Sequence, residues 1–108
     1  MKILNIHKTI RPDELLQLIQ QKLNPLFKEH RQTEICFTAE NKNGVIEISG
    51  PSPYEGFLFR IEIKGRELWI TRSENYIDDV NALTVESILN MLFEELAGDT
   101  GITFVLEG

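Results

Sequence analysis

The chain has 108 residues, 42% hydrophobic and 26% charged, and its 17 acidic against 11 basic side chains give a net charge of −6. This balance argues against general binding to nucleic-acid phosphates or anionic membranes, because both require a surplus of basic side chains. No apolar run approaches the ~20 residues of a membrane span, and the single cysteine, Cys36, fits a reducing compartment. We therefore expect one cytoplasmic domain spanning residues 1–108.

The first part of the chain predicts a short strand followed by a helix. The strand is expected within Met1–Lys8, where apolar and polar residues alternate. Pro12 suits the first position of a helix. From there apolar residues recur at helical spacing: Leu15, Leu16, Ile19, Leu23, Leu26 and Phe27. Pro25 disfavours a helical conformation in the preceding residue, so we expect the regular helix to end or kink there.

From Thr33 the apolar period changes to two, which predicts antiparallel strands. Turn residues at Asn41–Gly44, Gly50–Gly56 and Gly65–Arg66 divide this segment into a four-stranded meander with one apolar face. The alternation in the third strand places Phe57 on that face and Leu58 on the other.

The last third predicts a second helix and a final strand. Thr84 can act as N-cap, and apolar residues follow helical spacing from Val85 to Ala97. Gly98 suits a left-handed residue at the helix end, and Ile102–Leu106 is short, apolar and β-prone. The predicted fold is therefore α+β, with two layers: an antiparallel four-stranded meander plus short terminal strands, and two helices on one face, in the order (β)αββββαβ.

Pairing across the Gly65–Arg66 turn predicts an unusual position for Trp69. The register places it on the outer, polar face of the sheet, opposite Glu62 and near Arg60. A tryptophan there requires either a covering segment or a partner. We expect cover from the N-terminal segment or the Pro51–Tyr54 loop, or a protein contact anchored by Trp69, with a cation–π contact from Arg60 in either case.

The acidic residues are concentrated in the last third of the chain. Residues 1–72 hold every lysine and arginine, whereas residues 73–108 hold no base and eight acids: Glu74, Asp78, Asp79, Glu86, Glu94, Glu95, Asp99 and Glu107. A solvated flank that keeps the protein soluble explains this pattern, and so does a surface that attracts a basic partner. Asp78 and Asp79 also suit the start of the second helix or a preceding turn.

Three acids lie where they oppose the dipole of the second helix. Glu94, Glu95 and Asp99 fall at its C-terminal end, where a cation normally stabilises the helix. We expect the cation that compensates these acids either on a partner or in the basic C-terminal half of the first helix, which contains Lys22, Lys28 and Arg31.

Motifs for catalysis and cofactor binding are not found in the sequence. Asp99-Thr100-Gly101 matches the short signature of aspartic proteases, but it follows a helix close to the end of the chain, so we interpret it as a helix-to-strand turn. Cys36 has no identifiable histidine partner, and no cluster has metal-ligand spacing. We predict no cofactor, no catalytic residue and no metal site.

These observations favour a small cytoplasmic protein-interaction or inhibitory module, similar in role to an immunity protein or antitoxin, that binds a basic partner surface. Two alternatives stay open: a homodimeric accessory or structural subunit joined through the outer sheet face, and a small enzyme using paired carboxylates. The candidate interaction residues are Glu74, Asp78, Asp79, Glu86, Glu94, Glu95, Asp99, Trp69, Arg60 and Tyr54.

Overall fold

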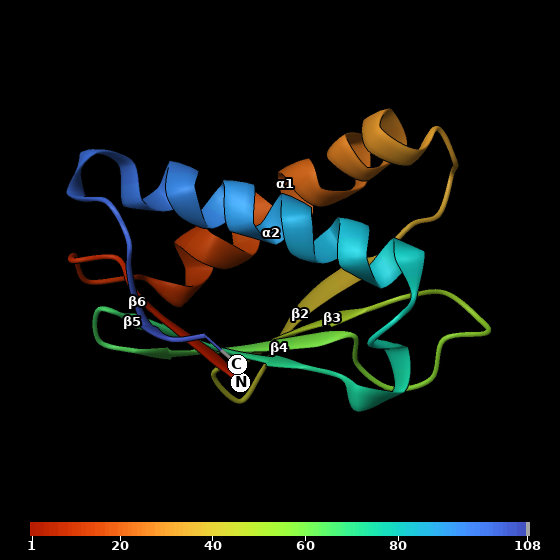
Figure 1. Cartoon of the computed structure of the whole chain (residues 1–108). Helices are drawn as coiled ribbons and strands as arrows, with labels where there is room; N and C mark the ends of the chain where they lie inside the picture. Colours follow the sequence, from red (N-terminus) through yellow and green to blue (C-terminus); the bar gives the residue numbers. More distant parts are fainter. Residues whose placement is uncertain (108) are drawn as a thin grey trace.

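The computed structural model describes residues 1–107; Gly108, the last residue of the expected domain, lies outside the described residues. The chain folds as β1 (Lys2–Asn5), α1 (Pro12–Arg31), β2 (Thr38–Lys42), β3 (Val45–Ser49), β4 (Phe59–Lys64), β5 (Glu67–Arg72), η1 (Glu74–Tyr76), α2 (Val80–Ala97), η2 (Gly98–Thr100) and β6 (Thr103–Leu106). The fold is α+β with the element order expected from the sequence. Figure 1 shows the two helices in one layer and the sheet in the other.

The sheet has six strands in the order β2-β3-β4-β5-β1-β6, and every neighbouring pair is antiparallel. Strands β2 to β5 form the expected meander, β1 is added beside β5, and β6 is added beside β1. Both ends of the chain therefore lie at one side of the sheet, as Figure 1 shows. The two edge strands are β2 and β6.

The hydrophobic core lies between the sheet and the two helices. Phe27 of α1, Phe59 of β4 and Phe93 of α2 are its largest fully buried side chains. Full burial of an apolar side chain of this size stabilises the fold by about 1.5–3 kcal/mol. The inner face of the sheet is therefore occupied by the fold itself, and any binding surface must lie elsewhere.

Helix α1 does not end at Pro25, which was one of the two outcomes predicted there, but continues to Arg31. Beyond the proline, Phe27 is fully buried and its ring meets the ring of Phe37 edge-on, with centroids 4.8 Å apart. A proline removes one backbone hydrogen bond from a helix interior. The buried aromatic contact holds the last turn despite that loss.

The first meander strand begins at Thr38, not at the predicted Thr33. Its partner β3 ends at Ser49, which Thr38 faces, and Gly50-Pro51 follows. A proline has no backbone N–H to give to a ladder. Residues before Thr38 therefore have no strand opposite them.

The alternation predicted for the next strand is wrong at its start. Leu58 is buried, whereas Phe57 is only partly buried and lies beneath the guanidinium of Arg60 on the outer face. The backbone N–H of Leu58 donates to the carbonyl of Ile48 in β3, and Phe59 is paired with the same residue in the sheet. The strict alternation of faces is broken at this point.

Helix α2 begins one turn earlier than predicted, and Thr84 is not its N-cap. Asp79 caps the helix, with its Oδ2 accepting a hydrogen bond of 2.9 Å from the backbone N–H of Ala82. Thr84 lies within the helix and donates to the carbonyl of Val80. The apolar pattern of the sequence did not indicate the first turn of α2, because Val80 and Leu83 are exposed. Gly98 has the positive φ, 57°, expected after the helix end.

Candidate interaction surfaces

Trp69 lies on the outer face of the sheet in the predicted register, opposite Glu62. On its other side it pairs with Ile3 of β1, so the N-terminal segment is its neighbour. Its indole N–H donates to a carboxylate oxygen of Glu67 at 3.0 Å. The predicted cation–π contact with Arg60 is wrong: Lys64 occupies that place, with its Nζ 3.7 Å from the ring centroid. These contacts leave Trp69 partly buried.

The β2–β4 half of the outer face is charged and internally paired. Glu47 accepts a hydrogen bond of 3.0 Å from Arg60 and lies 3.3 Å from the ammonium of Lys42. Partial burial alone would raise the pKa of Glu47, but the hydrogen bonds and charges of Arg60 and Lys42 hold that pKa below its usual value. Lys64 and Glu62 form a further pair at 3.7 Å. This half therefore presents matched charges to solvent.

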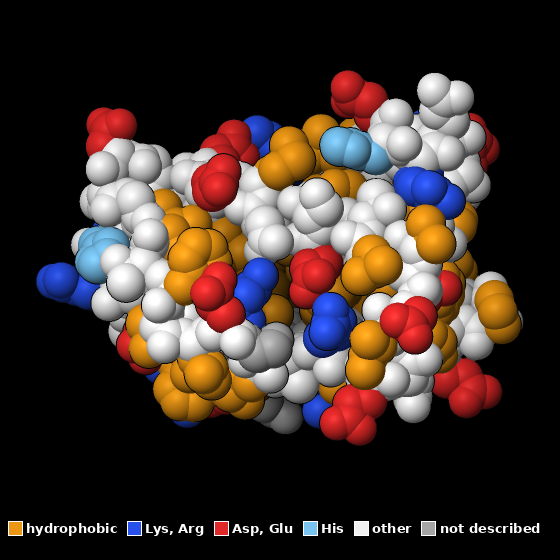
Figure 2. All heavy atoms as spheres, in the orientation of Figure 1, with side chains coloured by type: hydrophobic (Ala, Val, Ile, Leu, Met, Phe, Trp, Pro, Cys, Tyr) orange, Lys and Arg blue, Asp and Glu red, His pale blue; other side chains and the backbone are white. Residues whose placement is uncertain are grey.

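The β5–β1–β6 half of the outer face carries an apolar row beside the polar row Glu67, Asn5 and Thr103. Directly paired residues share a face of the sheet, and the row through Trp69 continues to Ile3 and then to Leu106 of β6. Ile3 is 8% exposed, whereas Leu106 is 47% exposed. Figure 2 shows hydrophobic side chains gathered at the lower left, where Figure 1 places these strands. The exposure of this apolar row therefore increases toward the β6 edge.

The β2 edge is covered by side chains of α1. The Asn24 amide makes two hydrogen bonds with the backbone of Phe37: it accepts from the N–H at 2.8 Å and donates to the C=O at 2.9 Å. Gln20 donates to the carbonyl of Ala39, also at 2.9 Å. The exposed side chains of β2 include Glu40 and Lys42. Charged side chains and occupied backbone groups both discourage pairing with another strand.

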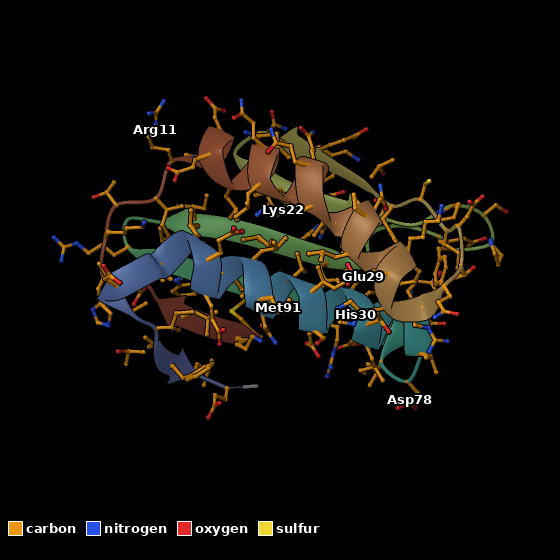
Figure 3. All side chains as sticks on the ribbon, turned by 90° about the horizontal axis from the view of Figure 1, so that it is seen from above. Arg11, Lys22, Glu29, His30, Asp78 and Met91 are labelled. Carbon is orange, nitrogen blue, oxygen red and sulfur yellow. The ribbon has the colours of Figure 1, made fainter. Side chains whose placement is uncertain are left out.

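The β6 edge has no comparable cover among the described residues. All four residues of β6 are exposed, and Phe104 and Val105 show 56% and 52% of their surface. Its one side-chain hydrogen bond to another element joins Thr103 Oγ1 and His7 Nε2, 2.7 Å apart. Viewed onto the helices in Figure 3, β6 projects beyond α2, so neither helix covers it. An exposed apolar edge strand is a template for pairing with another chain, whereas a β-bulge, such as the register shift that β6 has at Val105, opposes regular pairing.

Several of the predicted acidic residues are used within the fold. Glu95 forms an ion pair with Lys22 of α1, so the cation that compensates this residue lies within the same chain. Figure 3 shows Lys22 on the side of α1 that faces α2. Glu86 lies 3.6 Å from Arg72. Such pairs at exposed positions contribute about 0.2–1 kcal/mol each.

The remaining predicted acids do not form one patch. Glu74, Asp78, Glu94 and Asp99 are exposed and have no ion pair within residues 1–107. Asp78 precedes the first turn of α2, as Figure 3 shows, and Asp99 follows its last turn. A helix rises 1.5 Å per residue, so these two are separated by roughly 30 Å.

Tyr54 belongs to a third region, at the start of α2. Its hydroxyl donates to Asp79 Oδ2 at 2.8 Å, and its ring meets that of Tyr76 edge-on at 5.1 Å. Burial and the neighbouring Asp79 carboxylate raise the pKa of Tyr54, against an opposing hydrogen bond from Asn81. Tyr54 therefore fixes the cap of α2 and is not brought together with Trp69.

The β6 residues were missed as a candidate surface by the sequence reasoning. The segment Ile102–Leu106 contains no charge and was predicted as a strand, but its neighbours in the sheet could not be read from the chain. The absence of charge in this apolar segment was the sequence feature that could have indicated a candidate surface.

Groups of three or more side chains that could hold a metal ion are not found in the described residues. Cys36 is exposed. The helices within residues 1–107 are too short or too polar to cross a membrane. No protein-family model, curated protein or solved structure matches this chain.

Proposed function

We propose that this protein is a protein-interaction module that binds its partner at the β6 surface. The β6 surface comprises the open edge of β6 with Phe104 and Val105, and the adjoining outer-face residues Leu106, Ile3 and Trp69. The observation that carries this proposal is the difference between the two sheet edges: α1 amides occupy the backbone at the β2 edge, and the β6 edge is apolar and open.

Strand addition is the binding mode that fits this surface. A strand laid along a sheet edge gains backbone hydrogen bonds, and its alternate side chains gain apolar contacts. The exposed parts of Phe104, Val105 and Leu106 provide those contacts. Because the surface is apolar, increased salt should not weaken the complex, whereas it weakens contacts between opposite charges.

Affinity capture with matched variants tests the proposal. Val105→Lys places a charge on the β6 edge, and Ser87→Lys places the same charge on an exposed position of α2, in the other layer. We expect the wild type and Ser87→Lys to retain the same bound protein at low and high salt, and Val105→Lys to lose it. Equal capture by Val105→Lys would overturn the β6 surface as the binding site.

A second candidate is the basic partner expected from the charge distribution. Its support is that Glu94 and Asp99, near the C-terminal end of α2, are exposed and unpaired among the described residues. Glu94→Lys should then slow association and flatten its salt dependence, as expected for electrostatic attraction. Glu95 is kept unchanged in this test because its loss would also break the pair with Lys22. Unchanged association kinetics in the Glu94→Lys variant would contradict this candidate.

A further inference from the structure

We infer that the pocket beside Tyr54 binds an arginine side chain of a partner protein. The Tyr54 pocket has a volume of about 330 Å³, and the residues that line it include Ile35, Pro51, Pro53, Tyr54, Tyr76 and Asp79. It lies at the start of α2, whereas β6 follows the other end of that helix. The inference therefore goes beyond the proposed function and does not depend on the β6 surface.

Two segments of the chain form most of the pocket wall. The connection between β3 and β4 contributes Pro51–Tyr54, and the segment from η1 to α2 contributes Tyr76 and Asp79. The backbone N–H of Glu55 donates to the Tyr76 hydroxyl at 2.7 Å. The Tyr54 hydroxyl donates to Asp79 Oδ2, so the two segments are joined twice. Figure 1 shows both segments at the same end of the molecule. The wall is therefore formed before a ligand arrives, which reduces the entropic cost of binding.

The same two segments are acidic. Residues 50–57 and 73–81 contain no lysine, arginine or histidine. The flanking bases are used elsewhere, since Arg60 and Arg72 form ion pairs with acids outside the two segments. Figure 2 shows acidic side chains beside hydrophobic ones at the lower right, where Figure 1 places these segments. The pocket therefore attracts a positively charged ligand. The four acids of the segments, none of which forms an ion pair within residues 1–107, are Glu55, Glu74, Asp78 and Asp79.

Asp79 has a carboxylate oxygen available to the ligand. Its Oδ2 accepts hydrogen bonds from the N–H of Ala82 and the hydroxyl of Tyr54, and these two bonds hold the side chain in place. Its Oδ1 accepts no hydrogen bond from residues 1–107. A hydrogen bond between a charged donor and a carboxylate is roughly twice as strong as one between neutral groups. A guanidinium can supply that donor while both existing bonds are kept.

The other walls match the remaining parts of an arginine side chain. The rings of Tyr54 and Tyr76 line the pocket, and a guanidinium stacks on aromatic rings more readily than the strongly hydrated ammonium of lysine does. Ile35, Pro51 and Pro53 are apolar and suit the methylene stem. Ligand pockets generally measure about 300–1,000 Å³, so a pocket at the lower end of this range fits one side chain. Charge, aromatic rings and size therefore agree on arginine.

A peptide titration followed by NMR tests the inference. The probe is acetyl-Gly-Arg-Gly-amide, and its control is the same peptide with citrulline, whose uncharged urea group has the shape of a guanidinium. The arginine peptide should shift the signals of Tyr54, Tyr76 and Asn81, which line the pocket, and should bind less tightly in high salt. The citrulline peptide should bind about tenfold more weakly, and a lysine peptide about threefold more weakly. Equal affinity for the arginine and citrulline peptides, or no shift of these signals with arginine, would overturn the inference.

Asp79→Asn supplies a second readout, from the side of the protein. Asparagine caps a helix as well as aspartate does, so this variant keeps the start of α2 and loses the charge in the pocket. Asp13→Asn is the matched control, because it removes the same charge from an exposed position in the first turn of α1. Figure 3 shows Arg11, just before Asp13, and Asp78, just before Asp79, at opposite ends of the molecule. Asp79→Asn should bind the arginine peptide about tenfold more weakly than Asp13→Asn does. Equal binding by the two variants would overturn the assignment to this pocket.

Tyr76→Leu tests the aromatic wall without a change of charge. Leucine keeps that wall apolar and removes the ring, so the preference for the arginine over the lysine peptide should fall from about threefold to none. This ratio is measured within one variant and so does not depend on how Asp79→Asn folds. An unchanged preference would overturn the choice of arginine as the occupant.

Discussion

The two edges of the sheet differ in how far side chains cover their backbone groups. At the β2 edge, α1 places Asn24 and Gln20 against the backbone of Phe37 and Ala39, and the strand carries exposed charges. At the β6 edge, four exposed residues, three of them apolar, carry no such cover among the described residues. Both edges offer unpaired backbone groups in principle. The β6 edge is therefore the less covered of the two, although a register shift against β1 breaks its regular pairing at Val105.

The outer face repeats this division. Its β2–β4 half is charged and organised around Glu47, which is paired with Arg60 and Lys42. Its other half carries Trp69 and Ile3 beside β6. Covered backbone and matched charges therefore coincide on one side of the sheet, and open backbone and apolar side chains coincide on the other.

Removal of the cover from the β2 edge should have the largest effect on stability. Asn24→Ala leaves the backbone N–H and C=O of Phe37 without their partner, and an unsatisfied, partly buried group costs about 1–3 kcal/mol. Urea unfolding should show a loss of about 2 kcal/mol, against less than about 0.5 kcal/mol for the exposed Gln17→Ala in the same helix. If the two variants are equally stable, Asn24 does not secure this edge.

Truncation of Trp69 should have the next largest effect. Trp69→Ala removes a partly buried ring that pairs with Ile3 and lies under Lys64. Full burial of a large apolar side chain contributes about 1.5–3 kcal/mol, so a partly buried ring should contribute about 1–2 kcal/mol. Thermal or urea unfolding measures this loss, with Glu62→Ala on the neighbouring strand as a control. A cost no greater than the control's would mean that β1 does not pack against Trp69.

The stability that the ion pairs of Glu47 contribute in the charged half should depend on pH. The pKa of Glu47 is lowered in the folded protein, so its ion pairs stabilise the fold above the ordinary glutamate value of 4.5, and that stabilisation is lost as the pH falls through the lowered pKa. Glu47→Gln should therefore cost about 0.5 kcal/mol at pH 7. The difference from wild type should disappear in strongly acidic solution. A deficit of constant size across this range would contradict the assigned pKa shift.

The smallest effect on folding is expected at the open edge. Val105 is 52% exposed, and substitutions at such positions change stability by less than about 0.5 kcal/mol. Val105→Lys should thus unfold at nearly the wild-type urea concentration when both are measured without a partner. A large loss of stability would show that Val105 is part of the core, and the side chain would then be unavailable to a partner.

Much of the fold was predictable because local patterns decide it. The alternation around Ile61 and Ile70 set the register that placed Trp69 outside, and the structure has that register. The errors arose where tertiary contacts override local preference: burial of Phe27 carries α1 past Pro25, and Asp79 starts α2 before its apolar stripe.

The candidate site was less predictable for a topological reason. The strand at Ile102–Leu106 was recognised, but its place at the sheet edge depends on the addition of β1 and β6 beyond the meander. The number of charges in a segment of the sequence also does not show how far apart those charges lie in the fold. Glu95 has its cation in Lys22, and the other acids extend from Glu74, before α2, to Glu107, after β6.

Backbone hydrogen exchange, measured on the protein alone and with its captured partner bound, tests most directly whether the β6 edge is the binding surface. Amides of Thr103–Leu106 should exchange more slowly in the complex, because outward-pointing N–H groups of an edge strand become hydrogen-bonded or shielded when a partner covers them. The amides of Thr38–Lys42 should not change and provide the internal control. Unchanged exchange throughout Thr103–Leu106 in the complex would contradict binding through this edge.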